Sequence, residues 1–304
     1  MRMYLAGGDS EMWLSCLMAG NHPYILSSFH NGLYNQSGTE RWVDWYHRLN
    51  KMNAKFIMDS GLFTMMFGAG KDKEWKENDL IKYTHQYLDT MVQIKYDQVV
   101  VEMDVQKLLG REVHKKFRKI FEKKWDIEKT IYVWHLNDGL EGWKEICKRY
   151  PWVALSIPEM IMCLDKKKAD SIIREAINIA RKINPKIKIH LLGCTQNSLL
   201  MRKGYYSCDS TSWLGGARFG SAGHKLFING KMRSPPQGLT GRSWKPYQKA
   251  LKDIHRDVYN IVKPKNKNTL YFLYACIAIR AHSKQNSFIN QKYYNNEPIA
   301  KLWN

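Results

Sequence analysis

Short apolar runs alternate with amphipathic stretches along the first part of the chain. Eight runs predict β-strands, over residues 3–5, 24–27, 55–58, 98–103, 130–134, 152–155, 186–192 and 205–208. Stretches with helical periodicity lie between them, over residues 11–19, 40–51, 78–94, 113–124, 139–149, 167–183 and 198–203. Alternating strands and helices indicate parallel strands, because each crossover needs a covering helix. Eight such units predict an α/β protein with a closed (β/α)8 TIM-type barrel, and a doubly wound open sheet is the alternative.

The pattern changes after the eighth predicted strand. Residues 215–244 are rich in Gly, Ser, Lys and Arg, which predicts a long basic loop, and such loops are uncommon unless they are functional. Helices are expected over residues 247–262 and 269–283, followed by a polar tail. We therefore expect a barrel over residues 1–220, with the basic loop and C-terminal helices of residues 221–304 packed on it.

The charge of the chain indicates a polyanionic partner. Its 304 residues include 48 Lys+Arg and 28 Asp+Glu, a formal net charge of +20. Self-repulsion on this scale opposes a compact fold, so the excess is typical of proteins that bind a polyanion, either nucleic acid or an anionic membrane surface. Lysines outnumber arginines 34 to 14. Because Arg is the commoner reader of bases, this ratio favours backbone contact over strict sequence readout.

Several other classes are excluded by the sequence. No apolar run approaches the roughly 20 residues of a membrane span, and the N-terminal segment lacks the apolar stretch of a secretion signal. The six cysteines are dispersed without C-x-x-C spacing, which predicts neither a metal site nor a disulfide framework. We expect reduced thiols and a cytoplasmic protein, in the host cytoplasm if a phage encodes it. The first βα turn, Ala6-Gly7-Gly8-Asp9, lacks the G-x-G-x-x-G fingerprint of dinucleotide binding.

Three aspartates come directly after predicted strands. Asp59, Asp104 and Asp209 follow or close apolar runs. Residues at the carboxyl ends of barrel strands line the active site, and a carboxylate there is costly unless it is hydrogen-bonded or used. Each Asp can equally cap the next helix or turn, and that interpretation stays open for each one taken alone.

The neighbours of two of these aspartates suggest a chemistry. Asp59-Ser60-Gly61-Leu62-Phe63 combines polar atoms, a flexible backbone and an aromatic ring, a set that could hold a planar heterocycle. Asp209 precedes a flexible basic segment. A carboxylate of this kind can attack an anomeric carbon and form a glycosyl-enzyme intermediate.

At these residues the chain resembles the tRNA-guanine transglycosylase superfamily, in particular its smaller branch that inserts 7-deazaguanines into DNA in phages and bacterial modification islands. The resemblance runs in order through most of residues 1–220. The segment beginning at Asp59 resembles the family motif Asp-Ser-Gly-Gly-(Phe/Tyr). There the Asp is a general acid/base and the aromatic, here Phe63, stacks on the base. Asp209 falls at the position of the nucleophilic Asp.

The resemblance also implies a binding site for the base. Asp104 resembles the base-recognition Asp, and His135 falls where the tRNA enzymes place a base-reading Gln. Ser156 and Ile157 fall at a backbone contact, and Gly193 closes a segment that resembles the family's Leu-(Met/Leu)-Gly strand end. Ser60 and Gly61 complete the predicted substrate-binding set. No metal or other cofactor is implied.

The departures from the family pattern favour DNA over tRNA. Asp209 is followed by Ser-Thr-Ser-Trp-Leu in place of Pro-Thr-Arg, and only Cys276 lies beyond it, so the three-Cys, one-His zinc site of the tRNA enzymes is missing. The expected activity is exchange of guanine in DNA for a 7-deazaguanine such as 7-cyano-7-deazaguanine. The same reaction on tRNA, a non-catalytic nucleic-acid-binding barrel, and a glycosidase-type hydrolase using Asp104 and Asp209 stay open.

The expected partners are DNA and a free 7-deazaguanine base, without a membrane. Helper proteins of a modification system and the oligomeric state are left open. The residues expected to contact nucleic acid lie in or next to the basic loop: Trp213, Arg218, Lys225, Lys231, Arg233 and Arg242. Trp213 could wedge into or stack on bases, and the cations would contact phosphates.

Overall fold

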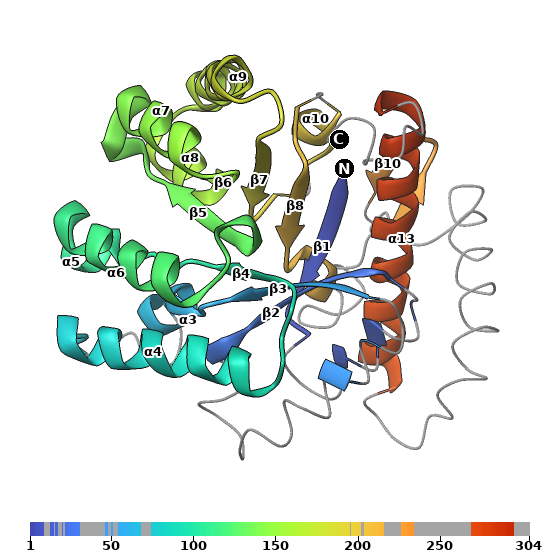
Figure 1. Ribbon diagram of the computed structural model, residues 1–304. Helices are drawn as coiled ribbons and strands as arrows, with labels where there is room; N and C mark the ends of the chain where they lie inside the picture. The colour runs from blue at the N-terminus through green and yellow to red at the C-terminus, as the bar shows by residue number, and fades with distance from the viewer. Residues whose placement is uncertain are drawn as a thin grey trace. The chain divides into compact units, whose positions relative to one another are not determined.

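The eight strands close into a barrel in the order β1-β2-β3-β4-β5-β6-β7-β8, with helices flanking it (Figure 1). The computed structural model describes residues 1–8, 13–14, 16–17, 20, 22–30, 46–47, 50, 54–67, 74–194, 196–201, 204–215, 226–233 and 269–294. The predicted (β/α)8 barrel is therefore confirmed, and the open-sheet alternative is wrong.

The barrel strands are three to five residues long. They are β1 (Arg2–Ala6), β2 (Tyr24–Ser28), β3 (Lys55–Asp59), β4 (Val99–Val101), β5 (Thr130–Trp134), β6 (Trp152–Ser156), β7 (Lys188–Leu192) and β8 (Ser207–Ser210). The described pairings are parallel, with Tyr4 opposite Asp209 between β1 and β8 and Ser156 opposite Leu192 between β6 and β7.

The longer helices follow the strands in alternation. They are α4 (Glu77–Gln93), α6 (Arg111–Lys124), α7 (Gly139–Arg149), α9 (Lys166–Ile183) and α13 (Thr269–Tyr293). Short pieces complete the set: α3 (Leu62–Phe67), α5 (Gln106–Leu109), α8 (Ile157–Cys163), α10 (Asn197–Leu200), and the 3-10 turns η2 (Ile127–Lys129), η3 (Leu136–Asp138) and η4 (Ser212–Leu214). The short helices α3, α5 and α8 lie between a strand and its long helix, and their one or two turns are too short to show a helical period.

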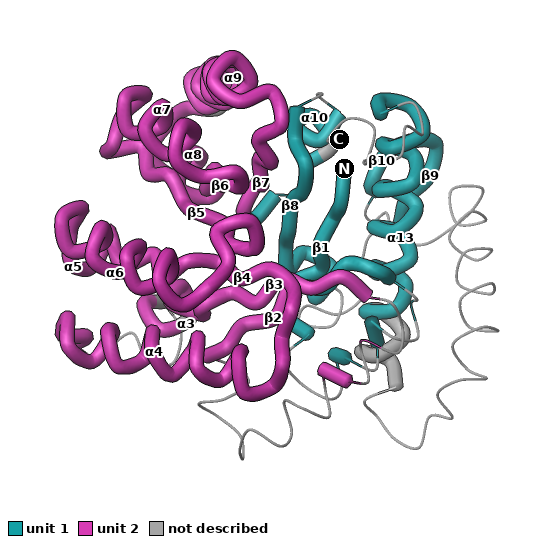
Figure 2. The backbone as a smooth tube through the Cα atoms, viewed as in Figure 1, with its two compact units in different colours: residues 1–25, 193–304 teal, residues 26–192 magenta. Residues whose placement is uncertain are grey.

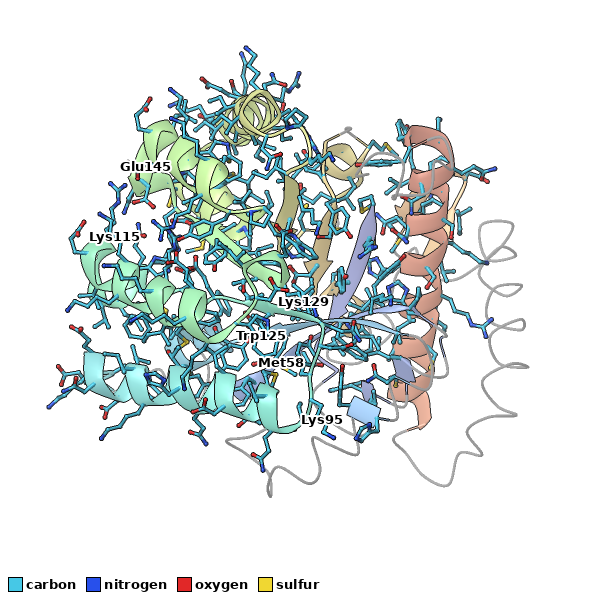
Figure 3. The ribbon with its side chains drawn as sticks, viewed as in Figure 1. Met58, Lys95, Lys115, Trp125, Lys129 and Glu145 are labelled. Atoms are coloured by element: carbon cyan, nitrogen blue, oxygen red, sulfur yellow. The ribbon has the colours of Figure 1, made fainter. Side chains whose placement is uncertain are left out.

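Residues 26–192 form one of two compact units (Figure 2). Its helices bury their apolar faces, and Trp143 on α7 and Ala176 on α9 are both fully buried. Trp143 Nε1 also donates a hydrogen bond to the Ala176 carbonyl oxygen at 2.7 Å, which links the two helices. Asp165 caps α9 by accepting from the Lys168 amide at 2.9 Å. Charged side chains point outward from these helices, as Lys115 on α6 and Glu145 on α7 do in Figure 3. The lysines of α6 thus lie on a solvated face.

Residues 1–25 and 193–304 form the other unit. Helix α13 packs along β1. On this helix, Asn290 Oδ1 accepts a hydrogen bond from the N-terminal amino group of Met1 at 2.8 Å. The predicted basic loop contains a two-stranded antiparallel hairpin, β9 (Leu226–Ile228) and β10 (Lys231–Arg233).

Two predicted features fall in parts of the chain that the structure does not describe. The helix expected over 247–262 and the boundary at residue 220 lie outside the described residues. Among the helices that are described, none combines the length and the apolar character that crossing a bilayer requires.

Candidate active site

Asp59 begins a turn at the end of β3 in which hydrogen bonds and close packing fix the backbone. It is the last residue of the strand, and its Oδ2 accepts a hydrogen bond from the Gly61 amide at 3.1 Å. Gly61 has φ +82°, and a Cβ at this position would lie 2.4 Å from His30 Cβ. Ser60 is buried, and its carbonyl oxygen accepts from the Tyr83 hydroxyl at 2.7 Å. Only glycine fits both the left-handed backbone and the available space.

We expect Gly61→Ala to destabilise the protein through strain and a clash together. Gly110→Ala is the matched control, because Gly110 has the same φ of +82° but a Cβ added there would meet nothing within 4 Å. The strain alone should cost about 1 kcal/mol, and the clash should add about 1–3 kcal/mol at Gly61 only. Urea unfolding of both variants measures the difference, and equal losses would mean that the Gly61 site relaxes freely.

Phe63 is the exposed aromatic of this turn. It lies on α3 and its side chain is 69% exposed, whereas most aromatic residues of the described chain are buried. An exposed ring next to a strand-end carboxylate can receive a planar ligand. Its predicted stacking on a base stays a prediction.

Asp104, His135 and Glu159 form a buried chain of polar contacts. His135 Nε2 lies 2.5 Å from Asp104 Oδ1, and His135 Nδ1 lies 3.2 Å from Glu159 Oε2. His135 is only 3% exposed, while the Asp104 side chain is 28% exposed. Burial alone lowers the pKa of His135, but the hydrogen bonds to Asp104 and Glu159 outweigh it and raise that pKa to about 10. His135 is therefore a buried imidazolium between two carboxylates.

A second buried ion pair supports this chain of contacts. Arg118 on α6 holds both Glu102 oxygens, at 2.8 and 2.9 Å, and also donates to the Val133 carbonyl oxygen at 2.8 Å. Glu102 accepts from the Val133 amide at 2.7 Å. Burial raises the pKa of Glu102, but the charges of Arg118 and His114 lower it to about 2 overall. The pair fixes the segments that carry Asp104 and His135.

The two remaining predicted residues of this region join β6 to α8. Ser156 ends β6 and caps α8, where its Oγ accepts from the Glu159 amide at 3.4 Å. Ile157 is buried at 1% exposure. Ser156 thus caps a helix, and the same cap orients Glu159; its predicted contact with the substrate stays a prediction.

Asp209 lies within β8 rather than after it. The predicted strand covered residues 205–208, whereas β8 covers Ser207–Ser210, because it is these residues that pair with β1. Asp209 is 8% exposed, and its Oδ1 accepts from the Gly193 amide at 3.1 Å. The structure therefore brings together two of the predicted residues, Asp209 and Gly193, whose φ of +64° suits glycine.

The predicted contact of Trp213 with nucleic acid is wrong for this structure. Trp213 is fully buried, and its Nε1 donates to the Ala6 carbonyl oxygen at 2.7 Å. Its ring packs edge-on against Trp13. A side chain enclosed in this way has a packing role and offers no face to a base.

The predicted phosphate-contacting cations fall into two groups. Lys231 and Arg233 are exposed on β10. Arg218, Lys225 and Arg242 lie outside the described residues.

Among the residues that the structure describes, one group of side chains has the spacing of metal ligands. Ligand atoms of Asp104, His114 and His135 lie within 4.8 Å of one another. His135 Nε2 is hydrogen-bonded to Asp104, and His114 Nε2 lies 3.3 Å from Glu102 Oε2, an ion-pair distance without a hydrogen bond. The nearby Arg118 guanidinium also disfavours a cation, so we assign the group to ion pairs and hydrogen bonds among its own side chains.

Sequence reasoning missed Glu159, Glu102 and Arg118. Glu159 follows the predicted Ser156-Ile157 segment by two residues, and Glu102 precedes Asp104 by two. Glu159 pairs with His135, 24 residues away along the chain, and Glu102 pairs with Arg118, 16 residues away, so no local signal marks either pairing.

Comparison of the chain with models of known protein families and with curated proteins gives no match.

Proposed function

We propose that this protein exchanges guanine in DNA for a 7-deazaguanine base, such as 7-cyano-7-deazaguanine, through a covalent glycosyl-aspartate intermediate. The observation that carries the proposal is the placement of three aspartates on a (β/α)8 barrel. Asp59 ends β3, Asp104 lies three residues beyond β4, and Asp209 lies in the last half of β8. In such barrels the active site is built at the carboxyl ends of the strands.

The reaction needs a nucleophile and a group that moves a proton. The Asp209 carboxylate attacks C1′ of a guanosine turned out of its stack, forming a C1′–O bond as the C1′–N9 bond breaks. Asp59 protonates the departing guanine. The incoming base then gives its N9 proton to Asp59, and its N9 attacks C1′ and releases Asp209. One glycosidic bond replaces another, so the exchange consumes no energy source.

Base selection is assigned to the turn after β3 and to the strand end at β4. The exposed Phe63 offers a ring for stacking, and the partly exposed Asp104 offers an acceptor for the amide and amine edge of the purine. Ser156, Ile157 and Gly193 are the further residues proposed to contact the base. None of these roles requires a cofactor.

The net charge of +20 supports a nucleic-acid substrate. The exposed cations of β10, Lys231 and Arg233, are our proposed phosphate contacts in the described chain. We favour DNA over tRNA because Asp209 is followed by Ser-Thr-Ser-Trp-Leu in place of the Pro-Thr-Arg that follows the nucleophile in the enzymes that act on tRNA.

We expect Lys231→Gln/Arg233→Gln to weaken DNA binding and flatten its salt dependence. Each lost phosphate contact should reduce the slope of log K against log salt by about 0.9, so the double variant should lose about 1.8. Lys115→Gln/Lys144→Gln is the matched control, with the same change in net charge on lysines already paired with Glu112 and Glu141. Fluorescence anisotropy at several salt concentrations gives the slopes, and equal slopes in the two double variants would exclude β10 as the contact.

Base-dependent release of guanine tests the proposed reaction against its alternatives. Duplex DNA carrying tritiated guanine would be incubated with the protein, with and without 7-cyano-7-deazaguanine. Exchange predicts release only when the free base is present, in an amount equal to the base incorporated. Release without added base would indicate the hydrolase, and binding without release in either case would indicate a non-catalytic barrel.

A further inference from the structure

Both nitrogens of His135 face carboxylates. Asp104 Oδ1 lies at Nε2 and Glu159 Oε2 at Nδ1, and the ring is almost fully buried. A neutral imidazole has one donor and one acceptor nitrogen, and a carboxylate only accepts, so one of these two contacts would oppose two lone pairs. Only the doubly protonated ring satisfies both contacts.

The charges around the ring also favour a cation at His135. Three carboxylates, Asp104, Glu159 and Glu102, lie in the cluster with two permanent cations. Arg118 holds Glu102, and Lys107 lies 3.5 Å from Glu159 Oε1. A protonated His135 places a positive charge between Asp104 and Glu159. His114 is the other titratable group that faces this cluster: its Nε2 lies 3.3 Å from Glu102 Oε2, and its ring centroid lies 6.2 Å from that of His135.

We infer that Glu159 and His135 are a positioning pair that holds Asp104 as an oriented, ionised acceptor. Glu159 fixes the proton on Nδ1 and the ring plane, and His135 then binds Asp104 Oδ1 through Nε2–H. This leaves the second oxygen, Oδ2, of a side chain that is 28% exposed to accept hydrogen bonds. His135 thereby acts through Asp104, in place of the direct contact with the base that the resemblance implied.

The arrangement defines a ligand class. An oriented carboxylate with one committed oxygen suits a planar heterocycle that presents adjacent N–H donors, as the lactam N–H and exocyclic amine of guanine do. Adenine presents an acceptor nitrogen beside its amine and would meet the carboxylate with a lone pair. The ligand class rests on the proposed function, whereas the coupling of the three side chains does not.

Nitrogen NMR of the ligand-free protein tests the coupling directly. Protein labelled with ¹⁵N-histidine would be titrated from pH 5.5 to about 11.5, with His135 assigned by comparison with His135→Gln. In the wild type both His135 nitrogens should stay protonated through about pH 8.5, as the pKa of about 10 requires. Glu159→Gln keeps the shape but removes the charge, and should move the midpoint down by about one to three pH units. Glu141→Gln, at an exposed glutamate of α7, is the control and should leave it unchanged.

Calorimetry with free guanine as the probe tests the positioning. His135→Leu removes the donor to Asp104 and should weaken guanine binding about tenfold, while His135→Gln keeps a donor and should recover most of the affinity. An unchanged His135 midpoint in Glu159→Gln would overturn the inference, as would wild-type guanine affinity in a folded His135→Leu protein. If the midpoint shifts as expected but the wild type binds no guanine, the positioning pair stands and the proposed function is refuted.

Discussion

Replacing Asp209 by Asn is expected to abolish base exchange while DNA binding persists. The Asn side chain can still accept the hydrogen bond from the Gly193 amide, now 3.1 Å from Asp209 Oδ1, so the local structure should survive. What is lost is the anionic oxygen that we propose as the nucleophile toward C1′. Loss of a nucleophile lowers turnover by about three orders of magnitude or more.

Initial rates of guanine release and DNA affinity, measured on the same preparation, check this expectation. Asp165→Asn is the matched control, because Asp165 is an exposed helix cap and Asn caps helices equally well. Its rate should equal that of the wild type. Turnover of Asp209→Asn within a few-fold of the wild type would remove Asp209 as the nucleophile.

The largest effect on stability is expected at the Glu102–Arg118 pair. Arg118→Met leaves the Glu102 carboxylate, 1% exposed, without its bidentate partner. Breaking a buried pair from one side costs about 3–5 kcal/mol, because the remaining charge is buried and uncompensated. Arg174→Met, at the exposed pair with Asp170, is the control and should cost about 0.5 kcal/mol or less.

Urea unfolding at several pH values tests the assignment further. The pKa of Glu102 is lowered from 4.5 to about 2 in the folded state, so its contribution is present above pH 4.5 and lost as the pH falls toward 2. The difference between wild type and Arg118→Met should therefore shrink over that acid range. A difference below about 1 kcal/mol at pH 7 would show that Glu102 is solvated or protonated in the folded protein.

Much of the barrel could be predicted from the period of the apolar residues. Strand β5 and helix α7 begin and end where their patterns do, because Thr130–Trp134 is wholly buried and Gly139–Arg149 has one apolar face. The ends of β4 and β8 could not be placed, since the predicted runs extend past the end of β4 and begin before the start of β8. Helix α13 continues past the predicted end at residue 283 because polar residues of its last turns, such as Asn290, have buried partners.

The candidate site shows a similar division. The position of Asp59 at the end of β3 follows from the alternation of elements, whereas Asp104 lies three residues beyond β4 and Asp209 lies within β8 rather than after it. The environment of Trp213 does not follow from that alternation, because burial depends on the chain that packs over it. The network of Glu102, Arg118 and Glu159 also lies beyond sequence reasoning, since its bonds join distant segments and any charged residue on a helix could equally face solvent.

Incorporation of a labelled base is the most direct test of the central claim. Purified protein would be incubated with radiolabelled 7-cyano-7-deazaguanine and either duplex DNA or bulk tRNA, and the polymers digested to nucleosides for mass analysis. The account predicts label in a deoxynucleoside of the expected mass from DNA, and none from the Asp209→Asn protein. Label in a ribonucleoside alone would assign the enzyme to tRNA. No label from either polymer, with intact DNA binding, would contradict the proposed exchange.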